Sequence, residues 1–180
     1  MPRSWWSFVI RGTIAGVILI VLVVDPLSAK ASVINYLGFF FFANGLFSLN
    51  IARNVIQTRE SIAMALLSLI GGLMVVLDSF LRPDADTRYF VGALAVAVGA
   101  LQISGQVHIS SHKLRQITRS NLLLGGLQII FGLCLIFLPT SLITLWAARL
   151  WMLATVAVMY WNAYRLRRLW QVIKAPEDNR

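Results

Sequence analysis

The chain has 180 residues, of which 58% are hydrophobic and 13% are charged. Soluble domains carry about 25% charged residues, so this composition excludes an ordinary soluble fold and predicts a membrane protein. The net charge of +9 does not indicate nucleic acid binding, because the basic residues lie between apolar segments rather than on a soluble module. The single cysteine, Cys134, excludes an intramolecular disulfide.

Six apolar segments follow one another, each close to the roughly 20 residues that a helix needs to cross a bilayer. They cover residues 5–24, 33–52, 61–81, 89–107, 121–138 and 142–164. Barrel strands alternate apolar and polar residues, whereas residues 14–24 are apolar throughout. We therefore predict an all-α polytopic membrane protein with six transmembrane helices. The first segment also resembles a cleavable signal peptide, an alternative that the internal repeat argues against.

The repeat is marked by prolines. Pro26, Pro83 and Pro139 each follow an odd-numbered segment, at separations of 57 and 56 residues. Such regular spacing predicts three tandem two-helix hairpins, at about residues 5–58, 59–115 and 116–174, within a single transmembrane domain of residues 1–174. Because each hairpin returns the chain to the same side, the repeats are parallel. We predict that the polar residues 175–180 form a disordered cytoplasmic tail.

Small residues recur at helical spacing within the segments. Gly38 and Gly45 are seven residues apart, as are Gly92 and Gly99, while alanines take this spacing in the third repeat. Seven residues are nearly two helical turns, so each pair lies on one face and lets a neighbouring backbone approach. We assign Gly12 and Gly16 of the first segment to helix packing as well.

Basic residues are distributed unequally between the two sides of the predicted bundle. One side carries twelve: Arg3, Arg11, Arg53, Arg59, Lys113, Arg115, Arg119, Arg165, Arg167, Arg168, Lys174 and Arg180. The other carries four: Lys30, Arg82, Arg88 and Arg149. The positive-inside rule places the first side, with both termini, in the cytoplasm, where it would meet anionic lipids.

Charged residues inside the spans are the first candidates for a functional site. Asp78 and Arg149 each lie about four residues inside the outer boundary of their spans, at similar depth given the helical rise. We predict that they form an intramembrane ion pair, and the alternatives are a proton-sensitive or transport role and no contact at all. Arg11 lies near the inner boundary, where its long side chain would reach the interface as an anchor.

The four aspartates on the outer side form a second candidate site. Asp25, Asp78, Asp84 and Asp86 balance the four outer cations while they are ionised. Aspartates in model peptides have a pKa of about 3.9, so strong acid would leave this face positively charged. These residues are therefore predicted to be proton-sensitive, with simple loop solvation as the alternative.

No motif for catalysis or cofactor binding is present. The chain lacks a nucleophile elbow, a phosphate-binding glycine loop and a helix with metal-ligand spacing. His108 and His112 are one helical turn apart, but no third ligand accompanies them. We therefore expect a protein that is not an enzyme and holds no cofactor or metal.

The glycines, prolines and aromatics together resemble the HdeD family of bacterial membrane proteins. The resemblance begins with Trp5, Trp6, Arg11, Gly12, Gly16, Pro26, Gly38, Asn44 and Gly45, and continues through Gly71, Gly72, Pro83, Gly92, Gly99, Gly125, Gly126, Gly132 and Pro139. It implies six helices in short repeats, a location in the inner membrane and a role in acid resistance. Alanines replace the paired glycines in the third repeat.

The preferred interpretation is a non-enzymatic HdeD-type membrane protein that contributes to envelope stress tolerance or acid resistance. A small channel or transporter is the first alternative, and a scaffold that recruits partners through the basic cytoplasmic face is the second. Nucleic acid is not an expected partner. A homo-oligomer is compatible with the sequence, which identifies no protein partner.

The charge distribution makes the topology testable. Reporter fusions after Ala52, Val107 and Arg180 should report cytoplasm, and fusions near Lys30, Asp84 and Thr140 should report the outside. Reversal at two or more of these sites would contradict the topology.

Overall fold

The computed structural model describes residues 4–24, 26–54, 59–82, 87–107, 115–138 and 142–174, which form six α-helices. The helices are α1 (Ser4–Val24), α2 (Pro26–Asn54), α3 (Arg59–Leu81), α4 (Arg88–Val107), α5 (Arg115–Phe137) and α6 (Leu142–Lys174). The predicted all-helical fold is confirmed for this part of the chain. The predicted disorder of residues 175–180 lies outside the described residues.

Local sequence explains several helix boundaries. Pro26 takes the first position of α2, where its missing N–H and fixed φ are compatible with a helix start. Glu60 lies in the first turn of α3, where a carboxylate interacts favourably with the helix dipole. α6 has 33 residues and continues well past the predicted span end at residue 164.

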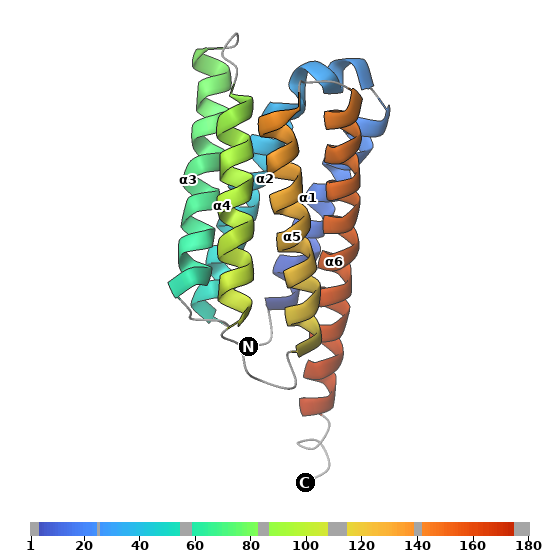
Figure 1. Ribbon diagram of the computed structural model, residues 1–180. Helices are drawn as coiled ribbons and strands as arrows, with labels where there is room; N and C mark the ends of the chain where they lie inside the picture. The colour runs from blue at the N-terminus through green and yellow to red at the C-terminus, as the bar shows by residue number, and fades with distance from the viewer. Residues whose placement is uncertain are drawn as a thin grey trace.

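The six helices form a closed ring. α1, α3 and α5 run toward one end of the bundle, and α2, α4 and α6 run back (Figure 1). We call the end where α1 begins and α6 ends the inner end, and the opposite one the outer end. Each helix contacts the next along the chain, and contact between α1 and α6 closes the ring.

The interfaces around the ring alternate between close and looser packing. The close ones are α2 with α3, α4 with α5, and α6 with α1, so they lie between the predicted hairpins rather than within them. At the first of these, a Cβ atom on Gly45 would lie 2.6 Å from the Cα of Leu69, and one on Gly72 would lie 2.7 Å from the carbonyl oxygen of Gly38. Backbones this close leave no room for a methyl group.

The interface between α4 and α5 is built in the same way. A Cβ atom would lie 2.8 Å from the Gly125 carbonyl oxygen if placed on Gly99, and 2.6 Å from the Gly92 carbonyl oxygen if placed on Gly132. In the α1–α6 interface, a Cβ atom on Gly12 would lie 3.2 Å from Met159, whereas Gly16 has ordinary van der Waals clearance. Glycine therefore brings backbones together most tightly at the first two interfaces.

A layer of aromatic rings fills the bundle where α2, α5 and α6 meet. Trp151 stacks on Phe131 with ring centroids 4.7 Å apart and on Phe41 at 5.7 Å, and Phe40 meets it edge to face at 5.2 Å. All four rings are buried. This aromatic layer, Phe40, Phe41, Phe131 and Trp151, fills the space between these three helices at its depth.

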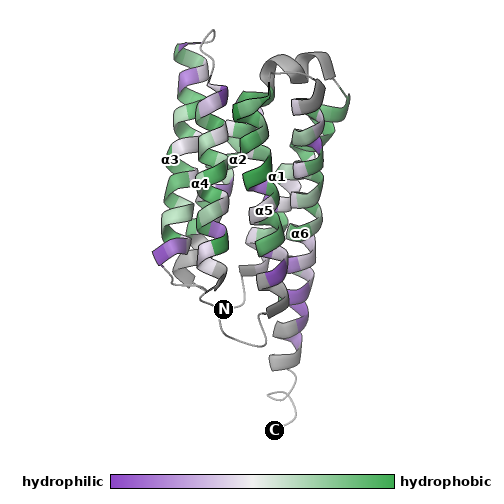
Figure 2. Ribbon diagram, in the orientation of Figure 1, coloured by the Kyte–Doolittle hydropathy of each residue, from purple (hydrophilic) through white to green (hydrophobic). Residues whose placement is uncertain are grey.

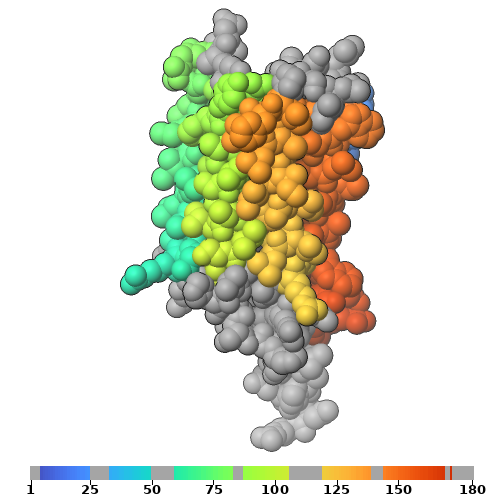
Figure 3. Space-filling model, in the orientation of Figure 1, coloured from blue at the N-terminus to red at the C-terminus, as the bar shows by residue number. Residues whose placement is uncertain are grey.

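Four of the helices are long and apolar enough to cross a membrane by length and composition. These spans are Trp5–Val24, Arg59–Leu81, Arg88–Gly105 and Arg119–Phe137, and α2 contributes a shorter apolar stretch, Val33–Leu49. Figure 2 shows hydrophobic residues along the helices and hydrophilic ones at the inner ends of α5 and α6. Figure 3 shows α3 to α6 packed side by side on one face. These features indicate a membrane protein.

The close packing predicts that alanine destabilises the protein at one glycine but not at another. Gly72→Ala should destabilise the protein by about 1 to 3 kcal/mol, because its methyl group would push against the backbone of Phe42 and Gly38. Gly126→Ala is the matched control, since nothing lies within 4 Å of its Cβ position. Thermal unfolding in detergent should show a lower midpoint for Gly72→Ala only. Equal midpoints for the two variants would contradict the packing argument.

Candidate functional site

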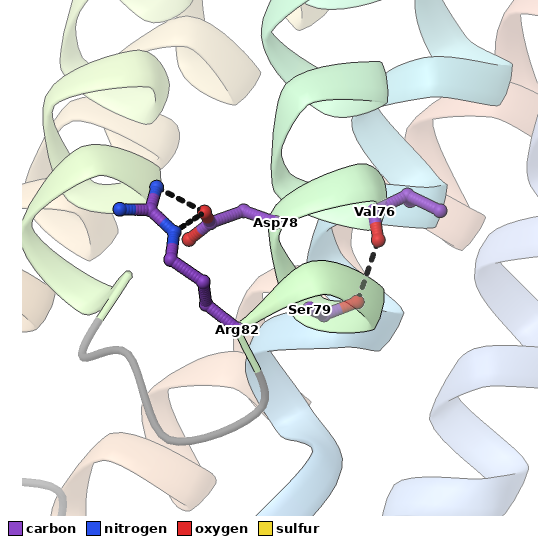
Figure 4. A network of polar contacts seen from close by, with 4 residues as sticks. All are labelled: Val76, Asp78, Ser79 and Arg82. Carbon is purple, nitrogen blue, oxygen red and sulfur yellow. Dashed lines mark hydrogen bonds and ion pairs between the residues drawn. The ribbon is translucent and has the colours of Figure 1, made fainter.

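Asp78 and Arg82 form an ion pair at the outer end of α3. The Nε of Arg82 donates to Oδ1 of Asp78 at 2.7 Å, and Nη2 of the same guanidinium donates to the same oxygen. The four-residue separation places both side chains on one helix face. Figure 4 shows Arg82 folded back against Asp78, while Ser79 points away and donates to the carbonyl oxygen of Val76.

The ion pair lies at a pocket between α3 and α4 with a volume of about 510 Å³. Leu77, Leu81 and Phe90 supply apolar walls, while Asp78, Arg82 and Thr87 supply the polar ones. The Asp78 side chain is only 19% exposed, whereas that of Arg82 is 74% exposed. The carboxylate therefore lies in the pocket wall, and the guanidinium lies exposed at the edge of the pocket.

The predicted pair between Asp78 and Arg149 is not formed. α3 and α6 are not neighbours in the ring, so similar depth does not bring the two side chains together. Arg149 instead donates through Nε and Nη2 to the carbonyl oxygen of Leu22, at 2.9 and 2.6 Å, and lies 4.9 Å from the centroid of the Trp146 ring. It joins α6 to the last turn of α1.

Arg88 makes a similar connection between α4 and α5. Its Nη1 donates to the carbonyl oxygen of Leu138 at 3.1 Å, and its Nη2 donates to the hydroxyl of Tyr89 at 2.8 Å. Carbonyls at a helix C-terminus lack intrahelical partners and carry the negative end of the dipole. Arg88 and Arg149 thus satisfy carbonyls at the outer ends of α5 and α1.

Arg11 does not reach the inner interface as an exposed anchor. It is only 8% exposed, and its guanidinium carbon lies 5.7 Å from the centroid of the Phe8 ring. The reason is helical phase: Phe8, Arg11 and Ala15 recur at three and four residues and share the buried face of α1.

Several other predicted residues lie outside the part of the chain that the structure describes. They are Asp25, Asp84, Asp86, His108 and His112. Asp78 is therefore the one outer aspartate whose surroundings are described. Among the described residues, no three His, Cys, Asp or Glu side chains gather in a way that could hold a metal ion.

Sequence reasoning missed Arg82 as the partner of Asp78, although the four-residue spacing on one helix was a visible signal. It also missed the aromatic layer, because rings from separate helices meet only in the folded bundle. The chain matches no protein-family model, and its comparisons with curated proteins and with solved structures give no significant match.

The partners found for Arg149 lead to a stability prediction. Arg149→Gln should cost about 1.5 to 3 kcal/mol, because a charged donor to the Leu22 carbonyl oxygen is lost. A double-mutant cycle with Asp78→Asn should give a coupling energy within about 0.5 kcal/mol of zero, measured by unfolding in detergent. A coupling energy well above that value would show that Asp78 and Arg149 do interact, which would contradict the geometry described above.

Proposed function

We propose that the chain is a six-span, HdeD-type protein of the bacterial plasma membrane, and that it contributes without enzymatic chemistry to acid tolerance. The architecture would consist of three tandem hairpins, α1–α2, α3–α4 and α5–α6, around a pseudo-threefold axis. The alternation of close and looser interfaces supports this repeat, because each close interface joins one hairpin to the next. α2 and α6 would complete the set of spans, since both pack side by side with apolar helices.

The inner end would face the cytoplasm. Three arginines near it lie over aromatic rings: Arg165 is 4.5 Å from the Trp161 centroid, Arg168 is 5.0 Å from that of Tyr164, and Arg167 is 5.6 Å from that of Trp5. Amphipathic rings and cations are favoured at the headgroup level, where anionic lipids attract basic side chains. Similar contacts occur at the outer end, where Arg88 lies over Tyr89 and Arg149 over Trp146, so the proposed orientation relies on the charge distribution.

The observation that carries the acid role is the ion pair between Asp78 and Arg82 at the outer pocket. Protonation of a carboxylate by strong outside acid removes its attraction for a neighbouring cation. Because the Arg82 side chain is 74% exposed, water would solvate its guanidinium once the pair breaks, and releasing it would leave the fold intact. The edge of the pocket would change from neutral to positive, which is a local charge switch of the kind that regulates binding surfaces.

A channel or transporter is less well supported. The aromatic layer fills the interior where α2, α5 and α6 meet, and rings packed in this way would obstruct a path along the bundle at that depth. The scaffold alternative relies on the basic inner face and stays a prediction.

The acid role can be tested by complementation of a deletion strain at matched protein levels, with survival scored after challenge at about pH 2.5. Wild type and Ser79→Ala should protect, because Ser79 is turned away from the ion pair. Arg82→Gln should not protect, because it lacks the cation that acid would release. Asp78→Asn should protect, because it imitates the protonated carboxyl.

Two results would contradict the proposal in different ways. If Arg82→Gln protects as well as wild type, the ion pair is not part of the mechanism. If the wild-type protein does not improve survival of the deletion strain, this protein has no role in acid tolerance.

A further inference from the structure

A positive charge is buried in the inner half of the bundle. Phe8, Arg11, Ala15, Ile18 and Leu22 form the inward face of α1, and all five are buried. Arginine stays protonated in proteins, so Arg11 brings a permanent cation into this interior. The contact with the Phe8 ring places its guanidinium toward the inner end, because Phe8 lies one turn closer to that end.

No acidic group compensates this charge among the residues that the structure describes. Arg11 forms no ion pair there, and its buried Nε has no hydrogen-bond partner. Glu60, also near the inner end, packs its Cβ against Gly105 at the interface of α3 with α4. A buried charge without an ionic partner costs several kcal/mol, so the site favours an anion.

Helix register places a polar side chain at the depth of Arg11. Gly12 meets Met159 of α6, and Trp151 of α6 stacks on Phe41 of α2. Met159 is eight residues inward of Trp151 and Ser48 is seven inward of Phe41, or about 12 and 10 Å by the helical rise. Ser48 therefore lies at about the depth of Arg11 along the bundle axis, on a helix that is adjacent to α1 in the ring, and it is 3% exposed.

The groups between Ser48 and the aromatic layer are also polar. Asn44 and Gln128 are each three residues inward of a ring in that layer, about 4.5 Å by the helical rise. Within the described part of the chain, no partner is found for the Oγ of Ser48, the Nε2 of Gln128 or the Nε1 of Trp151, nor for the Oδ1 of Asn44. Three of these four atoms can donate a hydrogen bond. Donors together with a guanidinium match an anion rather than a metal cation.

We propose that the inner half of the bundle binds a small monovalent anion of the halide class, held by the Arg11 guanidinium and the Ser48 hydroxyl. One negative charge matches the single buried cation. The anion would enter from the inner end, since Arg11 lies seven residues, about 10 Å, from the start of α1. The aromatic layer would prevent the anion from moving further toward the outer end. This site does not depend on the acid role at the outer pocket.

Anion-dependent stability tests the site on the full chain in detergent. Thermal midpoints would be measured in sodium chloride, bromide and gluconate at constant ionic strength. Binding to the folded state alone should raise the midpoint saturably in chloride and bromide, by roughly 5 to 10 °C at a hundredfold excess over Kd, but not in gluconate. Arg11→Gln should abolish the difference between salts. Arg168→Gln, which removes an exposed charge on α6, should keep it.

A second variant and a direct measurement keep the test decisive if Arg11→Gln unfolds. Ser48→Ala should fold and raise the chloride concentration for half-maximal stabilisation at least about tenfold, the loss of one hydrogen bond to a charged group. Equilibrium dialysis with radioactive chloride should rank wild type and Ser48→Ala by affinity in the same order as the thermal midpoints do. A wild-type midpoint that is equal in all salts, or a chloride dependence that Ser48→Ala leaves unchanged, would overturn the proposal.

Discussion

The close approach of helix backbones at every second interface is the constraint on which the rest of this bundle depends. In a bilayer, helices gain little from hydrophobic burial against one another, so association relies on van der Waals contact and on small residues that permit it. Gly38, Gly45 and Gly72 hold α2 against α3, and Gly92, Gly99, Gly125 and Gly132 hold α4 against α5. The third close interface, between α6 and α1, joins the two ends of the chain and closes the ring.

Closure of the ring creates an interior whose chemistry differs along its length. The inward faces of α2, α5 and α6 supply rings at the depth of Trp151, and below them polar side chains such as Asn44, Gln128 and Asn162. Part of this polar interior is internally satisfied: Asn162 donates to Asn121 and accepts a hydrogen bond from Ser120. Among the described residues, Arg11 and Ser48 carry buried polar atoms without a hydrogen-bond partner at about one depth, which is why we place the proposed anion there.

The outer end uses its cations in a different way. Arg88 and Arg149 donate hydrogen bonds to carbonyl oxygens at the ends of neighbouring helices, and their role is to connect those helices. Within the described part of the chain, the Arg82 side chain pairs with Asp78 on its own helix and is largely exposed, so it can change partner without disturbing the ring. The same residue type therefore serves structure at two positions and a proposed response to acid at the third.

Sequence by itself determined the class of the protein and the approximate place of its helices, because apolar length and composition report directly on the solvent that a segment requires. It also identified Gly38, Gly45, Gly92 and Gly99 as residues at helix contacts, although not the helices that they would meet. Tertiary structure alone decided the partners of the charged residues. Asp78 and Arg149 share a depth but not an interface, and Arg11 faces the interior because it lies on the buried face of α1 with Phe8 and Ala15. Depth follows from counting residues along one helix, whereas contact depends on which helices are neighbours and on how each is rotated about its axis.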